Sequence, residues 1–142
     1  MYIKDIFDTK KPVLSVEVFP PKKTENLEKV KSTVEEISKI PADYMSVTYG
    51  AGGSTSKLTA EIAQFMQDEL GVTSLAHLTC ISLTKSEIEE KLSELKEKGI
   101  KNILALRGDI PSGSEFPLKD GYSYASELTE AIKQYGGFCV GG

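Results

Sequence analysis

The chain has 142 residues, of which 39% are hydrophobic and 27% are charged, a composition typical of one globular domain. Its net charge of −4 argues against a sequence-independent nucleic-acid binder, because such proteins present a basic surface to the phosphates. No apolar stretch reaches the roughly 18 residues that cross a membrane, and the N-terminus lacks the apolar core of a signal peptide. We therefore expect a cytoplasmic protein without nucleic-acid or membrane partners.

Short apolar runs, each typical of a buried strand, recur along the chain. They begin near residues 13, 44, 74 and 102, and a fifth starts at Phe138. Segments of helical period separate them. In the first of these segments, Leu27, Val30, Val34 and Ile37 line one face. The expected helices span about 24–40, 57–70, 84–98 and 123–135.

Recognisable helix boundaries support these assignments. Thr24 is a plausible N-cap of the first helix, and Pro41 ends it. Thr84 and Glu87 form the pattern of a capping box at the start of the third. Glycines follow the later helices, as at Gly136, where the fourth is expected to stop.

Alternating strands and helices predict an α/β fold with a parallel sheet and right-handed crossovers. Each βα unit has about 30 residues, and eight such units make the about 250 residues of a (β/α)8 TIM barrel. The chain also ends within its fifth apolar run. We therefore expect residues 1–142 to be the N-terminal half of one catalytic barrel domain, truncated after four βα units and the start of strand five. A complete, flavodoxin-like doubly wound sheet of five strands is the alternative, and periodicity does not separate the two.

Polar residues stand at or near the C-terminal ends of the apolar runs. They are Glu17, Thr48, His77, Arg107 and Asp109. Because side chains alternate along a strand, each strand is expected to have one aliphatic face and one face that turns polar. In the fourth run, alternation puts Arg107 and Asp109 on the face of Ile103. A doubly wound sheet would keep both faces apolar, so the pattern favours a barrel whose mouth is the active site.

Glu17 is the first candidate for acid–base chemistry. An acid flanked by Val16 and Val18 should be partly desolvated, which favours its protonated form and suits it to proton transfer. The alternative is a buried glutamate paired with a neighbouring Arg or Lys.

Other motifs are less specific on their own. The glycine-rich segment 49–55 exposes backbone N–H groups to a ligand, but it is neither GxGxxG nor a P-loop and is equally typical of a tight turn. His77 is the only histidine, so it suits a hydrogen-bonded structural role, and with Cys80 it does not make a metal site. Arg107 and Asp109 flank Gly108, where a ligand can approach the backbone, with an internal salt bridge as the alternative. Cys80 and Cys139 are expected to be buried, reduced thiols.

Taken together, five stretches resemble methylenetetrahydrofolate reductase, the flavin enzyme of one-carbon and methionine metabolism. They occur in the order and at the spacing of that family, and together they cover nearly the whole chain. The stretches are 15–21 (SVEVFPP), 46–55 (SVTYGAGGST), 76–80 (AHLTC), 102–109 (NILALRGD) and 124–126 (YAS).

The resemblance implies a TIM barrel that binds FAD, takes a hydride from NADH or NADPH, and reduces 5,10-methylenetetrahydrofolate to 5-methyltetrahydrofolate. Glu17 matches the general acid that opens the imidazolidine ring of the folate. Asp109 matches a carboxylate that contacts both the flavin and the folate, and Thr48 matches a residue that touches the nicotinamide. The further FAD contacts that it implies are Tyr49, Ala51, His77, Arg107, Gly108 and Ala125.

The missing second half of the barrel opens several possibilities. We expect the isolated chain to bind FAD weakly or not at all, to turn over negligibly, and to associate through its open edges, for example as a homo-oligomer. A non-catalytic half-barrel that serves folding or partner binding is the alternative. A partner subunit that delivers electrons in place of the nicotinamide is a third possibility.

Overall fold

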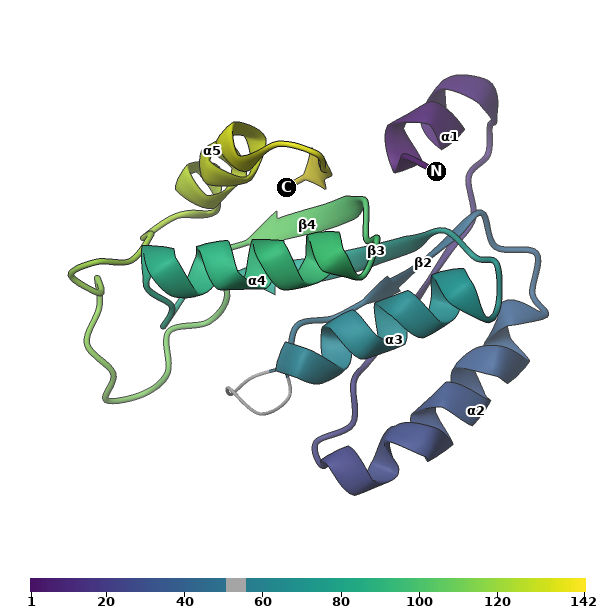
Figure 1. Cartoon of the computed structure of the whole chain (residues 1–142), viewed down its shortest axis with the longest axis horizontal. Helices are drawn as coiled ribbons and strands as arrows, with labels where there is room; N and C mark the ends of the chain where they lie inside the picture. Colours follow the sequence, from purple (N-terminus) through teal and green to yellow (C-terminus); the bar gives the residue numbers. More distant parts are fainter. Residues whose placement is uncertain (51–55) are drawn as a thin grey trace.

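The computed structural model describes residues 1–50 and 56–142, and within them it contains a five-stranded parallel sheet (Figure 1). The strands lie in the order β1-β2-β3-β4-β5, and each pairs with the next one along the chain. The expected α/β fold is therefore confirmed. A flavodoxin-like sheet has the strand order 2-1-3-4-5, in which the second and third strands lie on opposite sides of the first. In this sheet every strand is added on the same side of the one before it. The strands are β1 (Ser15–Val18), β2 (Tyr44–Val47), β3 (Ser74–Thr79), β4 (Asn102–Leu106) and β5 (Cys139–Gly141).

All four expected helices are present, with small differences at their ends. Thr24 opens a short 3-10 turn, η1 (Thr24–Asn26), and its side chain caps nothing, so the predicted N-cap is wrong. The capping box at the third expected helix is confirmed, because Thr84 and Glu87 exchange hydrogen bonds of 2.8 and 3.2 Å. The helices are α2 (Leu27–Ser38), α3 (Ser56–Asp68), α4 (Lys85–Glu97) and α5 (Ala125–Tyr135). None of the helices described is long and apolar enough to cross a membrane.

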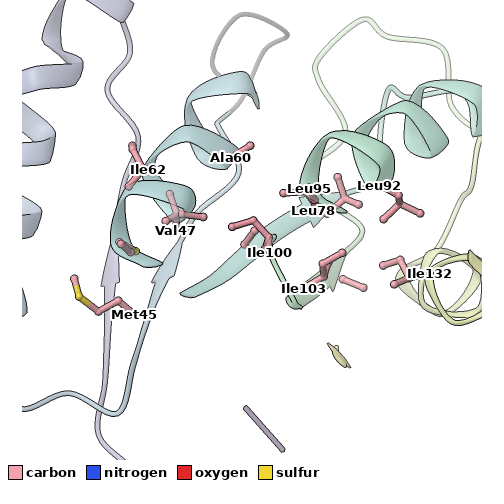
Figure 2. Close-up of a cluster of buried hydrophobic side chains, with 14 of the residues drawn as sticks. Met45, Val47, Ala60, Ile62, Leu78, Leu92, Leu95, Ile100, Ile103 and Ile132 are labelled. Atoms are coloured by element: carbon pink, nitrogen blue, oxygen red, sulfur yellow. The ribbon is translucent and has the colours of Figure 1, made fainter. Parts of the chain in front are cut away.

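One face of the sheet packs against these helices and forms the core. The register pairs Val47 with Ala76, and Leu78 with Ala105, and all four side chains are almost fully buried. Residues of α3, α4 and α5 complete the same cluster, which Figure 2 shows in close-up. Burial of this apolar surface is the main stabilising contribution to the fold.

The strand register corrects the expected placement of Arg107 and Asp109. Ile103 lies beside Ala76 on the helix-covered face and is fully buried, so alternation would have buried Arg107 as well. Instead β4 ends at Leu106, and both charged residues are exposed beyond the strand. Alternation predicts a face only while the strand continues, which is why this prediction was wrong.

A short N-terminal helix, α1 (Ile3–Thr9), was not expected, and it closes the end of the sheet where the strands begin (Figure 1). Its residues Ile3 and Ile6 are buried. The side chain of Asn102, only 1% exposed, accepts a hydrogen bond from the Ile3 N–H at 2.8 Å and donates to the carbonyls of Met1 and Ser74. These bonds hold α1 against β3 and β4.

Both cysteines carry free thiols, as expected for a reduced protein. Cys80 is buried, whereas Cys139 is only half-buried, so the expected burial is confirmed for the first alone.

Candidate functional site

Three polar side chains meet on the face of the sheet opposite the core. Glu17 of β1 lies directly opposite Ser46 of β2 in the strand register, and the Ser46 hydroxyl donates to Glu17 Oε2 at 3.3 Å. Nε2 of His77, on β3, lies 3.3 Å from the same oxygen. Residues far apart in the sequence thus converge because parallel neighbours present the same face.

Glu17 itself is more accessible than the sequence suggested. Its side chain is 49% exposed, so the expected desolvation by Val16 and Val18 is wrong for this chain. The two valines point to the opposite face, where Val18 joins the core. No Arg or Lys pairs with Glu17 in the described part of the chain, and its partners are Ser46 and His77 instead.

His77 is buried, at 7% exposure, and burial lowers the pKa of its imidazole below the usual 6.5, while the Glu17 carboxylate acts in the opposite direction. The neutral form therefore dominates near pH 7. Although Nε2 is close to Glu17, the geometry is not that of a hydrogen bond, and Nε2 has no hydrogen-bond partner among the described residues. A buried ring nitrogen without a partner is costly in a structural histidine, and it suits contact with a ligand.

A pocket of about 860 Å³ opens beside this cluster, at the carboxyl ends of the strands. Its volume falls within the range of small-molecule and cofactor sites, about 300–1,000 Å³. Five of the residues singled out from the sequence line it. They are Thr48, Tyr49, His77, Gly108 and Asp109.

The remaining candidates stand elsewhere. Glu17 touches His77 but does not line the pocket, and neither do Arg107 and Ala125. Arg107 is exposed and donates through Nε to the Gly108 carbonyl at 3.2 Å, so no salt bridge joins it to Asp109 in the described structure. Ala51 lies outside the described residues, together with most of the glycine-rich segment.

Gly108 stands in the pocket wall at a position that only glycine occupies without strain. Its φ of +85° is strained for other residues, and a Cβ there would lie 2.6 Å from Cγ2 of Ile81. The carbonyls of Leu106 and Arg107 accept from the amides of Cys80 and Ile81, which extends the β3–β4 ladder up to this glycine. The position of Asp109, next in the chain, is therefore set by backbone geometry.

A second wall of the pocket was not predicted. It comes from the turn after β3 and from one face of α4, with Ile81, Ser82, Leu83, Glu87, Glu90 and Lys91. Hydrogen bonds from Thr84 hold the pKa of Glu87 below its usual value, so this carboxylate is charged. The capping box located the start of α4, but which face meets the pocket depends on how the helix crosses the sheet. Together with Asp109, the described pocket lining carries three carboxylates and one lysine.

The long loop between β4 and α5 is fastened to the start of α4. The Lys85 amide donates to the Asp120 carbonyl at 2.8 Å, and Thr84 forms an antiparallel bridge with Gly121. At its far end, the Glu127 carboxylate accepts from the amides of Ser123 and Tyr124. This loop therefore gives the pocket rim a defined shape. The described residues contain no group of three His, Cys, Asp or Glu that could hold a metal ion.

Comparison with known proteins shows which family the chain matches. The family model for methylenetetrahydrofolate reductase matches residues 2–142. The 5,10-methylenetetrahydrofolate reductase of Escherichia coli is 34% identical over 127 residues. A probable methylenetetrahydrofolate reductase (NADH) of rice is 37% identical over 129 residues, and methylenetetrahydrofolate reductase (NADH) 1 of Arabidopsis thaliana is 34% identical over 139.

These matches cover most of this chain but a minor part of each relative. The E. coli match takes in 89% of this chain and 42% of the relative. The rice match also takes in 89% of this chain, and 22% of the plant protein. The Arabidopsis match takes in 96% of this chain and 24% of that relative. The chain therefore spans less than half the length of the curated relatives it matches.

Proposed function

The chain belongs to the methylenetetrahydrofolate reductase family, and from this membership we propose that it contributes half of an active site that reduces 5,10-methylenetetrahydrofolate to 5-methyltetrahydrofolate. The observation that carries the proposal is the convergence of Glu17 and His77 beside a pocket at the carboxyl ends of parallel strands. NADH is the favoured electron donor, because the rice and Arabidopsis relatives are named for it. NADPH remains the alternative donor.

The pocket residues suit the flavin that the family resemblance implies. Gly108 lines the pocket without a side chain, and the buried Nε2 of His77 offers a hydrogen-bonding partner. Thr48, Tyr49 and Asp109, which line the same pocket, would complete the contacts, and the family resemblance adds Arg107, Ala51 and Ala125 to the proposed set. When bound, FAD would take up the hydride from the nicotinamide and deliver it to the folate.

Glu17 is the proposed general acid. Its carboxyl group is half exposed on the open face, where a folate ring can reach it, and protonation of a ring nitrogen would open the imidazolidine ring. The carboxylate of Asp109 would then stabilise the positive charge that develops on the folate. The protein's task is to bind, orient and protonate, because the cofactor supplies the redox chemistry.

Closure of a TIM barrel would require further strands. β1 and β5 are the two edges of the described sheet, and the described helices α2 to α5 pack on the face opposite Glu17, whose side chain is 49% exposed. Unpaired edges and an open inner face favour association, either with the remaining βα units of the family fold or with a second copy of the chain. We expect residues 1–142 alone to bind FAD weakly and to turn over negligibly.

The same two open edges also support the alternative, a non-catalytic half-barrel that serves as a folding or partner-binding unit. In that case Glu17 would be dispensable for chemistry. A further variant of the catalytic proposal is a partner subunit that delivers electrons to the flavin in place of the nicotinamide. In the family, most nicotinamide contacts come from the second half of the fold, which residues 1–142 do not include.

A chimera tests the proposal directly. Residues 1–142 would replace the matching segment of the E. coli relative, so that the second half of the barrel is supplied. We expect the chimera to purify with bound flavin and to reduce methylenetetrahydrofolate with NADH. A folded chimera without flavin or without folate reduction would favour the non-catalytic alternative.

A further inference from the structure

Ser46 is a residue of this cluster to which the sequence assigned no function. It is 6% exposed and lies on β2 directly opposite Glu17. Its hydroxyl donates to Glu17 Oε2, the same oxygen that lies 3.3 Å from His77 Nε2. Two side chains from neighbouring strands thus meet one oxygen of the carboxyl group, whereas no hydrogen bond reaches Oε1 from the described residues.

We propose that Ser46 is a positioning residue that holds Oε2 of Glu17 beside His77 and leaves Oε1 as the oxygen that carries and transfers the proton. The proposal rests on the proposed function of Glu17 as the acid. An oxygen that accepts a hydroxyl donor is the carbonyl oxygen of a protonated carboxyl group, so its proton resides on the other oxygen. During transfer the O–H bond at Oε1 breaks, the proton moves to the ring nitrogen of the folate, and the hydroxyl of Ser46 stabilises the charge left on the carboxylate.

The hydrogen bond between Ser46 and Glu17 is long. At 3.3 Å the Ser46 contact is longer than the usual 2.5–3.0 Å for a hydroxyl donor. Catalytic hydrogen bonds are often long before the ligand is present and shorten in its complex. Among the described residues, Tyr49 and the Lys91–Glu94 ion pair of α4 share a small cavity with His77. Three further carboxylates, Glu87, Glu90 and Asp109, line the main pocket with it.

The single histidine makes the coupling measurable on the 142-residue chain itself. One imidazole signal in NMR gives the titration curve of His77 without assignment ambiguity. In Ser46→Ala, Oε2 loses its hydrogen-bond donor and becomes a better acceptor for the nearby imidazole, so the pKa of His77 should rise by about half a unit. Ser46→Thr keeps a hydroxyl and should restore the original curve. Ser15→Ala removes an exposed hydroxyl from the same face of β1 and should change nothing.

A double-mutant cycle separates positioning from a general structural effect. If Ser46 acts through the carboxyl group, Ser46→Ala should have no effect on the His77 curve in the Glu17→Gln background. An unchanged curve in Ser46→Ala, or an equal shift with and without Glu17, would overturn the proposal. This readout does not depend on turnover, so it stands apart from the proposed function: an inactive chimera with an intact cycle would reject folate reduction and leave the positioning of the carboxyl group supported.

Discussion

Oε2 of Glu17 lies 3.3 Å from Nε2 of His77, although the two residues are 60 positions apart and belong to strands that do not pair with one another. β2 lies between them and contributes Ser46 to the same oxygen. The relationship links an accessible carboxyl group to a buried, neutral imidazole. It places the proposed acid–base group on the exposed face of the sheet and the proposed cofactor contacts at the adjoining strand ends.

The burial of His77 predicts a loss of stability in mild acid. Burial lowers the pKa of the folded imidazole below 6.5, so the unfolded chain binds a proton first as the pH falls. The free energy of unfolding should therefore be constant above about pH 7 and decrease as the pH falls below 6.5, with a slope of at most about 1.4 kcal/mol per pH unit. Urea unfolding at a series of pH values measures it.

His77→Asn is the control for this prediction. The variant lacks the titrating group, so its stability should not follow the wild-type slope between about pH 5 and 6.5. An equal slope in both proteins would mean that other groups cause the acid sensitivity.

Gly108→Ala should destabilise the chain through two separable effects. A left-handed φ costs about 1–2 kcal/mol for an L-residue, and the close contact of the new Cβ with Ile81 adds about 1–3 kcal/mol. Gly99→Ala is the matched control, because Gly99 has a φ of +70° but no atom within 4 Å of a Cβ. Urea unfolding of both variants should show Gly108→Ala to be the less stable. Equal stabilities would contradict the close packing at the pocket wall.

The hydrogen bonds of Asn102 predict a large cost for removing its side chain. Asn102→Ala removes the buried hydrogen bonds to the Ile3 amide and the Ser74 carbonyl and a part-buried one to the Met1 carbonyl, so the free energy of unfolding should fall by about 2–4 kcal/mol. Hydrogen exchange should show α1 opening first.

Ser74→Ala provides the comparison at the same end of the sheet. The Ser74 hydroxyl is fully buried and has no hydrogen-bond partner in the described structure, so its removal should be neutral or stabilising. A cost as large as that of Asn102→Ala would mean that cavity formation, and not hydrogen bonding, sets the stability of this region.

The two thiols should differ in reactivity towards a thiol reagent. Burial raises the pKa of the Cys80 thiol, and burial also restricts access to it. Cys139, which is half-buried, should therefore react faster, and labelling of Cys80→Ser and Cys139→Ser variants would separate the two rates. Faster labelling of Cys80 would indicate that β3 and its following turn open readily.

Much of the fold was predictable because its signals are local. Apolar runs and helical period located all five strands and four helices, and the capping box at Thr84 was confirmed. The helix α1 was missed because seven residues with three apolar positions carry too little periodicity. Its stability depends on Asn102, 99 residues away from Ile3, and such a long-range contact has no local signature.

The site was predictable only where the strand pattern itself determines the geometry. Glu17 and His77 were singled out correctly as members of one face, but the flanking valines of Glu17 suggested a burial that the open sheet does not provide. The positions of Arg107 and Asp109 depend on where β4 ends and on the backbone turn at Gly108. The acidic wall from α4 depends on helix packing, which residue spacing does not specify.

The most direct test of the central claim is the oxidation of reduced flavin by methylenetetrahydrofolate in the chimera that carries residues 1–142. Stopped-flow absorbance would follow the flavin in the unmodified chimera and in Glu17→Gln, with equal flavin content checked first. We predict that the substitution slows the folate-dependent oxidation by at least about 100-fold, the usual contribution of a general acid, while reduction of the flavin by NADH is retained. Equal rates of folate-dependent oxidation in the two proteins would contradict the account.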